Sequence, residues 1–216
     1  SWKELVEIAR WCPTVHNLQP HQVKIISETE AELFYNPERL LPVEDPDSIF
    51  TTIAIGVFIE NLSIAAAPFG YKVIIDHLYD SISIKSLKPT LFAKLKLVSN
   101  SEKEVLNEKL IVKRRTSRVH YDGKILNENT IQRIKKESEK FGHDFFHSSE
   151  KDIVDFVITL NEETLFEDLG SKPTRDELDR LFRYNKKEAE FHKDGLWTKC
   201  SRRSRSRRRR EGGREG

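Results

Sequence analysis

One long apolar segment constrains the fold of this chain more than any other feature. From Asp45 to about Pro68, apolar residues occupy nearly every side of a helical projection, with Glu60 and Asn61 as the main interruption. An Asp-Pro pair suits a helix start, because Asp accepts backbone N–H groups and Pro needs no partner for one. A helix that is apolar on all sides is normally buried on all sides. The segment therefore predicts the central core helix. Its polar interruption argues against a membrane span, which needs ~20 largely apolar residues.

Shorter elements on either side of this helix define the fold class. Amphipathic spacing predicts helices, and short apolar runs between turn residues predict strands. Helices are expected at residues 2–11, 102–112, 127–141, about 150–165 and about 174–190. Strands are expected at 22–27, 31–35, 71–78, 91–98 and 144–147. Because strands and helices do not alternate regularly, the chain is predicted to be α+β.

Length and cysteine content limit the class of protein further. A chain of 216 residues predicts one domain or two small ones. Its two cysteines, Cys12 and Cys200, exclude a disulfide framework and a four-cysteine zinc site, and no metal site is predicted. No charged and apolar leader opens the sequence, so a cytoplasmic protein is expected.

The last residues differ sharply from the rest of the chain. Residues 201–216 contain eight Arg, two Glu and no Lys, whereas the preceding 200 residues carry a net charge of −4. Such a segment cannot bury a core and is expected to be disordered. An arginine-rich arm of this kind could bind nucleic acid through phosphate contacts. The abrupt change in composition favours instead an end that is not a selected part of the protein, so nucleic-acid binding is kept as an alternative.

Two segments carry residue types suited to ligand binding. The loop at 12–20, CPTVHNLQP, offers hydroxyl, imidazole and amide groups between prolines, and KRRTSR at 113–118 offers four cations and two hydroxyls. Alternate residues of an extended segment point the same way. Arg114, Thr116 and Arg118 are therefore expected to converge on one anion such as a phosphate. A well-capped connection and a solvated basic loop are the simpler alternatives for the two segments.

Four stretches carry a family resemblance. They are ARWCPTVHNLQPHQVKII, FYNPERLLPVEDPD followed by FTTIAIGVFIENLSIAAAPFGYKV, KRRTSRVHYDGKIL, and Asp194-Gly195-Leu196. In this order they resemble parts of the nitroreductase-like FMN oxidoreductases: the Pro-Ser loop before a strand, the Asp-Pro entry and long central helix, the R-R-[ST]-x-R segment, and a short Asp-Gly-Leu run. The resemblance is greatest to the tandem (Acg-type) branch, which has two such units in one chain.

The resemblance implies a nitroreductase-like FMN-binding fold in a chain shorter than full-length members. One complete unit would occupy 1–112, a partial second unit 113–199, and a tail 200–216. In that family the flavin lies between two units. The first unit would supply Pro13, Thr14, Val15 and Asn17, and the second would supply Arg114, Arg115, Thr116 and Arg118. The units would form an intrachain pseudo-dimer in the parent protein, with a homodimer as the alternative for this chain.

The function implied by the resemblance is that of an FMN-dependent oxidoreductase. NAD(P)H would donate a hydride to the flavin, which would pass it to an electron-poor small molecule such as a nitroaromatic or a quinone. No catalytic acid or base is identified. Two positions depart from the family pattern, because His21 replaces a Trp and Thr14 replaces a Ser. The alternatives are a flavin-binding or flavin-storage protein without enzymatic activity, and the nucleic-acid-binding protein considered above.

Overall fold

A computed structural model describes residues 1–101, 106–116 and 122–198 of the chain. Arg118 and the Arg-rich tail, both named in the sequence predictions, lie outside these residues. Packing divides the chain into two compact units. The first comprises residues 1–116 together with the C-terminal part from residue 176, and the second comprises 117–175. Residues 176–198 thus pack with the N-terminal unit. The assignment of 113–199 as a partial second nitroreductase-like unit stays a prediction.

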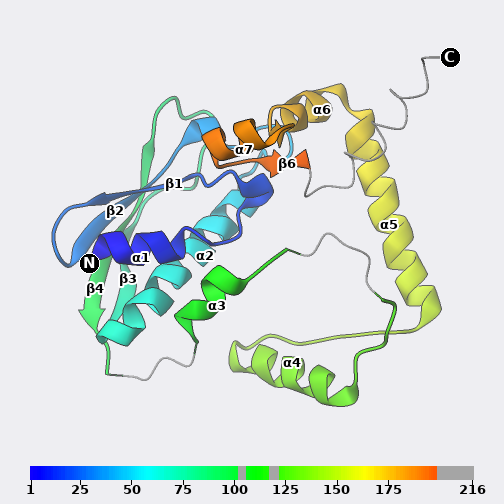
Figure 1. Ribbon diagram of the computed structural model, residues 1–216, viewed down its shortest axis with the longest axis horizontal. Helices are drawn as coiled ribbons and strands as arrows, with labels where there is room; N and C mark the ends of the chain where they lie inside the picture. Colours follow the sequence, from blue (N-terminus) through cyan, green and yellow to red (C-terminus); the bar gives the residue numbers. More distant parts are fainter. Residues whose placement is uncertain (102–105, 117–121, 199–216) are drawn as a thin grey trace. The chain divides into compact units, whose positions relative to one another are not determined.

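The first unit contains a four-stranded antiparallel sheet. Its strands lie in the order β1, β2, β4, β3. Figure 1 shows α2 running along one face of this sheet, with α1 beside it. The mixture of helices and strands agrees with the predicted α+β class. The bounds of the strands are His21–Ile25 (β1), Glu30–Tyr35 (β2), Tyr71–Leu78 (β3) and Thr90–Ser99 (β4).

Helix α2 (Ile49–Ala66) forms the core of this unit, but its N-terminal part is buried on one side only, whereas its last turns are buried nearly all round. Phe58 and Leu62 are fully buried among side chains of the sheet and α1. On the other side, Ile49 and Ile53 are 58% and 59% exposed. The prediction of a helix buried all round was therefore wrong. Together with the short turn that follows, α2 is long and apolar enough to cross a membrane by length and composition alone. Its buried side chains, Phe58 and Leu62 among them, belong to the hydrophobic core of this unit.

The start of α2 also differs from the prediction. The helix begins at Ile49, three residues after Pro46, and Ser48 precedes it in a left-handed conformation. Asp45 still stabilises this end, because its carboxylate accepts hydrogen bonds from the N–H groups of Phe50 (3.1 Å) and Thr51 (2.9 Å). The hydroxyl of Thr51 donates a third bond to the same carboxylate. The Asp is thus a cap that acts across an intervening turn.

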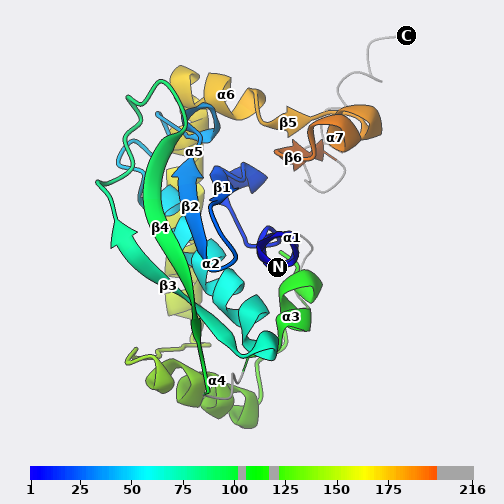
Figure 2. The ribbon, with the colours of Figure 1, turned by 90° about the vertical axis from the view of Figure 1, so that its left-hand side faces the viewer.

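Two shorter helices rest on α2. Helix α1 (Trp2–Ala9) buries Trp2 and Leu5, and α3 (Glu108–Lys113) buries Ile111. Figure 2 shows α1 and α3 side by side, and the two helices contact one another. Their C-terminal ends carry the beginnings of the two segments that the sequence analysis singled out.

The C-terminal part of the first unit is more complex than the single helix predicted at 174–190. Helix α6 (Lys172–Asp179) and helix α7 (Lys186–His192) are separated by strand β5 (Phe182–Arg183), which pairs in parallel with β6 (Leu196–Trp197). The buried carboxylate of Glu177 accepts hydrogen bonds from the N–H groups of Val43 (3.2 Å) and Glu44 (2.8 Å). This contact attaches the C-terminal part to the turn before α2.

The second unit contains α4 (Glu128–Lys140) and α5 (Lys151–Gly170). As predicted, Asn127 caps α4, with its side chain accepting from the N–H of Thr130, and Gly142 follows the helix at φ 71°. Residues 144–147, predicted as a strand, form none. The apolar side chains of α5, including Phe156 and Phe166, are largely exposed.

We predict that Asp45→Ala lowers the free energy of unfolding by about 2 kcal/mol, because three donors at the start of α2 lose their acceptor. Asp47→Ala is the matched control, since Asp47 is exposed two residues away. Urea unfolding followed by circular dichroism measures both. Equal effects of the two substitutions would show that the Asp45 cap does not stabilise the core helix.

Candidate functional site

A pocket of about 330 Å³ joins the two segments that the sequence analysis singled out. It lies within the first unit, where the ends of α1 and α3 meet the loop at 12–20 and the residue after α7. The lining residues are Arg10, Trp11, Cys12, Asn17, Gln19, Arg114, Arg115, Thr116 and Lys193. Asn17 from the first segment and Arg114, Arg115 and Thr116 from the second thus lie in one pocket.

The pocket is strongly basic. Four of its lining residues carry a positive charge, namely Arg10, Arg114, Arg115 and Lys193, and within the described chain no carboxylate lines it. Arg side chains match phosphate and carboxylate oxygens with two parallel donors, and Lys adds a point charge. The amide of Asn17 and the hydroxyl of Thr116 add neutral donors. This set of groups suits an anion with several oxygen atoms.

Arg114 and Arg115 of the second segment differ in the hydrogen bonds that they already make within the protein. Arg114 Nη1 donates to the hydroxyl of Thr116 at 3.1 Å, so these alternate residues lie together as the extended-segment argument expects. Arg115 Nη1 instead donates to the carbonyls of Val112 (2.6 Å) and Arg114 (2.7 Å). The guanidinium of Arg115 therefore closes the end of α3. Arg114 makes no ion pair within the described residues and is the better placed of the two to bind an anion.

The loop at 12–20 has an unusual backbone. His16, Asn17 and Gln19 have φ values of 47°, 60° and 52°, in the left-handed region that residues other than glycine seldom adopt. The hydroxyl of Thr14 accepts a hydrogen bond from the N–H of Gln19 at 3.1 Å and closes the loop on itself. Strain of this kind persists only where surrounding contacts hold it, and it is common at functional sites.

Of the four loop residues predicted to contact a flavin, Asn17 lines the pocket. Pro13, Thr14 and Val15 do not line it. Thr14 serves the loop closure, and Val15 begins a short 3₁₀ turn that ends at Asn17. A contact of these three residues with a flavin stays a prediction.

A turn at residues 193–195 holds the loop in place, and the sequence analysis assigned it no role in the site. Gln19 Nε2 donates to the carbonyl of Lys193 at 2.9 Å, and the N–H of Gly195 donates to the carbonyl of Asn17 at 3.3 Å. We call residues 193–195 the Lys-Asp-Gly turn. The Asp-Gly pair of the fourth resembling stretch was the available signal, but nothing in it pointed to Lys193.

The Lys-Asp-Gly turn is itself fixed by charge and by shape. Asp194 accepts from Arg183 Nη2 (2.6 Å) and Nε (3.0 Å) and lies 3.5 Å from Arg39 Nη1. Arg39 Nη1 also donates to the carbonyl of Leu18 at 2.7 Å, so the turn and the loop share a partner. Gly195 has φ 68°, and a Cβ there would clash with the carbonyl oxygen of Leu181. Only glycine fits this position.

Cys12 also lines the pocket, and its thiol is free and buried. Burial raises the pKa of its thiol to about 12, and the nearby Arg114 guanidinium opposes that shift only in part. A thiol with this pKa remains protonated near neutral pH, and the thiolate is the reactive form. His16 is engaged elsewhere, because its Nε2 lies 2.7 Å from Glu44 Oε2. Neither residue supplies a catalytic group to the pocket.

His21, which replaces the Trp of the resembling family, serves the core. Its ring stacks on Phe58 of α2, with centroids 4.0 Å apart and an interplanar angle of 18°. Burial lowers the pKa of His21 to about 4, with smaller contributions from Arg39 and Arg10. Its Nδ1 is buried and has no hydrogen-bond partner in the described chain. The neutral imidazole thus takes the place of an aromatic core residue.

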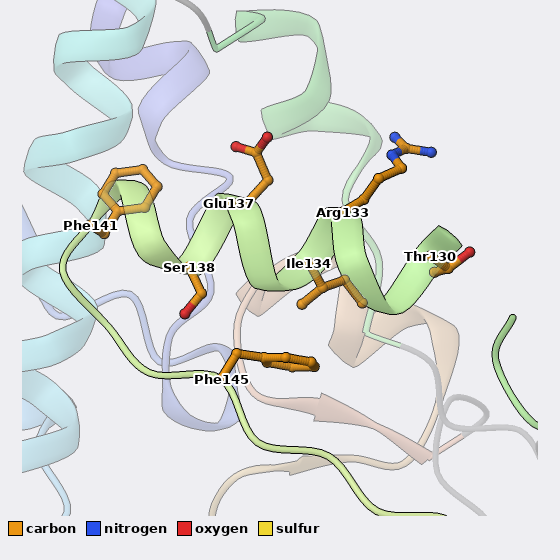
Figure 3. Close-up of a pocket in the computed structure, with 7 residues that line it drawn as sticks. All are labelled: Thr130, Arg133, Ile134, Glu137, Ser138, Phe141 and Phe145. Atoms are coloured by element: carbon orange, nitrogen blue, oxygen red, sulfur yellow. The ribbon is translucent and has the colours of Figure 1, made fainter. Parts of the chain in front are cut away.

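A larger hollow of about 660 Å³ in the second unit lacks a convergent set of polar groups. Figure 3 shows Ile134 and Ser138 directed toward the chain that carries Phe145, while Arg133 and Glu137 point away from it. A binding site usually aims a few polar groups at one point. This hollow does not, so the basic pocket is the better candidate. Among the described residues there is no group of three or more His, Cys, Asp or Glu that could hold a metal ion.

The chain is similar to a protein of known structure. That protein is from Desulfovibrio desulfuricans, provisionally assigned as a nitroreductase and solved in complex with FMN. The two chains are 13% identical with a TM-score of 0.36, over 53% of this chain and 77% of the other. No family model and no curated protein matches this chain. A TM-score of this size does not establish a shared fold, so the case for function rests on the chemistry of the pocket.

We predict that the free energy of unfolding falls as the pH is lowered from about 6.5 to about 4, partly because of His21. Its pKa in the folded chain is below the ordinary value, so folding favours the neutral form and protonation favours the unfolded chain. His21 would account for a loss of up to about 3 kcal/mol. His21→Phe keeps the ring stack and removes the titration. A pH series of urea unfolding curves should show a shallower decline for the variant, and identical slopes would contradict the role of His21.

We also predict that Gly195→Ala destabilises the first unit more than Gly70→Ala. Both glycines have positive φ, but a Cβ at Gly70 meets no atom within 4 Å. Gly70→Ala should therefore cost about 1 kcal/mol from the backbone alone, and Gly195→Ala should cost at least about 2 kcal/mol because the Lys-Asp-Gly turn cannot close. Urea unfolding measures the cost, and the fluorescence of Trp197 reports release of β6. Equal costs would show that the close approach at Gly195 is not required.

Proposed function

We propose that the chain is an FMN-dependent oxidoreductase of the nitroreductase type whose basic pocket binds the phosphate of the flavin. One observation carries the proposal. Asn17 of the first resembling segment and Arg114, Arg115 and Thr116 of the second line the same pocket. The two segments are about 100 residues apart in the chain, and a shared phosphate site explains why both carry their donors to one place.

The groups in the pocket fit a phosphate monoester. Such a group has up to two negative charges and three exposed oxygens, which the positive charges, the amide and the hydroxyl can satisfy together. Ligand pockets usually span ~300–1,000 Å³, so about 330 Å³ suits the phosphate end of the cofactor rather than the whole molecule. Trp11, which is half exposed at the pocket, offers an aromatic surface beside it.

In this proposal the protein binds and orients the cofactor. Arg114 and Thr116, already hydrogen-bonded to one another, would hold the phosphate, and Asn17 would donate its amide. Arg118, which lies outside the described residues, stays a candidate from the sequence. The strained loop at 12–20 would keep Asn17 in place. When bound, FMN would supply the redox chemistry, taking a hydride from NAD(P)H and reducing an electron-poor small molecule such as a nitroaromatic or a quinone. An intrachain pseudo-dimer in the parent protein, a homodimer as the alternative for this chain, and a cytoplasmic location belong to the same proposal.

Binding of FMN to the purified chain, followed by quenching of flavin fluorescence, tests the phosphate site. Arg114→Gln should weaken FMN binding at least about tenfold, because a charge-assisted hydrogen bond is worth about 1.5–3 kcal/mol. Lys109→Gln is the control, since Lys109 is an exposed cation on the same helix. Riboflavin, which has no phosphate, should bind equally to both variants. Equal FMN affinity in the two variants would remove the phosphate site from this pocket.

Addition of NADPH without oxygen distinguishes the enzyme from the storage protein. Loss of the flavin absorption bands would support an oxidoreductase, and nitroaromatic or quinone should then restore them. Bands that persist would favour flavin storage. Failure of the chain to bind FMN at all would contradict both.

A further inference from the structure

We infer that Lys193, which belongs to a third segment of the chain, binds the anion in the basic pocket. Lys193 thereby makes the pocket selective for a phosphate monoester over the same molecule without its phosphate. The inference deepens the proposed function and rests on it for the identity of the flavin. Neither of the two segments found in the sequence contains this residue. It reaches the pocket from the end of α7, more than 70 residues after Arg114.

The first argument is that two of the other cations in the pocket already have partners within the protein. Arg10 Nη1 lies 3.2 Å from Glu7 Oε2 and is partly neutralised by it. Arg115 is tied to backbone carbonyls at the end of α3. Lys193, like Arg114, forms no ion pair with any residue that the structure describes. Its charge is therefore available to a ligand without the cost of breaking an existing pair.

The second argument is that hydrogen bonds hold the backbone of Lys193, whereas the residue as a whole is exposed. The residue ends α7 in a left-handed conformation at φ 55°, with its N–H bonded to the carbonyl of Ala189. Its own carbonyl accepts from Gln19, and the next residue, Asp194, is fixed by Arg183. This conformation is energetically unfavourable for a residue other than glycine. This fixed backbone places Lys193 at the edge of the pocket.

The third argument concerns the charge of the ligand. A phosphate monoester near neutral pH approaches a charge of −2. Arg114 and Lys193, which form no ion pair among the described residues, both line the pocket and come from different segments of the chain. A dianion that contacts both would join α3 to the Lys-Asp-Gly turn. An uncharged alcohol such as riboflavin would gain nothing from either. Lys193 thus adds to the selectivity for the phosphorylated form that Arg114 begins.

The test compares Lys193→Gln with Lys187→Gln, which removes the same charge from an exposed position on the same helix. FMN and riboflavin are titrated against each variant by fluorescence quenching. Lys193→Gln should weaken FMN binding about tenfold, leave riboflavin binding unchanged, and make FMN binding less sensitive to salt. Lys187→Gln should match the original chain in all three respects. Equal FMN affinity in the two variants would overturn the inference.

A second measurement separates this inference from the proposed function. The melting temperature is recorded in inorganic phosphate and in chloride at equal ionic strength, with no flavin present. Phosphate should raise the melting temperature of the original chain and of Lys187→Gln more than that of Lys193→Gln. If this pattern holds while FMN fails to bind, Lys193 is an anion ligand and the flavin proposal is wrong. If phosphate stabilises all three chains equally, or none, the role of Lys193 is wrong whatever the flavin result.

Discussion

Burial of one face of α2 is the interaction on which the rest of the first unit depends. Phe58 and Leu62 are fully buried, and the same helix supports both α1 and α3. The two short helices could not be stable alone, because isolated helices of this length are marginal in water. Their docking on α2 brings their C-terminal ends together, and the pocket forms where those ends meet. The position of the candidate site is thus a consequence of core packing, although none of its lining residues belongs to α2.

The parts of the fold that depend on local sequence were predictable, and those that depend on distant contacts were not. The central helix and the strands of the sheet follow from their apolar patterns. The late start of α2 did not follow, because Asp45 caps the helix across a turn rather than from the adjacent position. The exposed side of α2 could not be inferred either, since apolar composition does not say which faces of a helix find a partner. At 174–190 a charged sequence hid the break that β5 introduces.

The candidate site likewise contains residues that could be predicted from local sequence and residues that could not. Asn17, Arg114, Arg115 and Thr116 were found from residue chemistry and resemblance, and the structure places all four in one pocket. Lys193 was missed, because its importance arises from a contact with Gln19 that no local pattern encodes. His21 departs from the pattern of the resembling family, yet its stack on Phe58 belongs to the core. Residue type alone did not distinguish these two roles.

The hydrogen bond between Gln19 and Lys193 bears on the order in which the parts of the first unit fold. The two residues are 174 positions apart in the chain. Contacts between such distant residues form late, because loop closure must precede them. During synthesis the N-terminal part emerges and folds first, so α1, α2 and the sheet can assemble while the Lys-Asp-Gly turn is still unmade. Lys193 can join the pocket only after nearly the whole described chain has been synthesised. We therefore expect the pocket to become able to bind an anion late in folding.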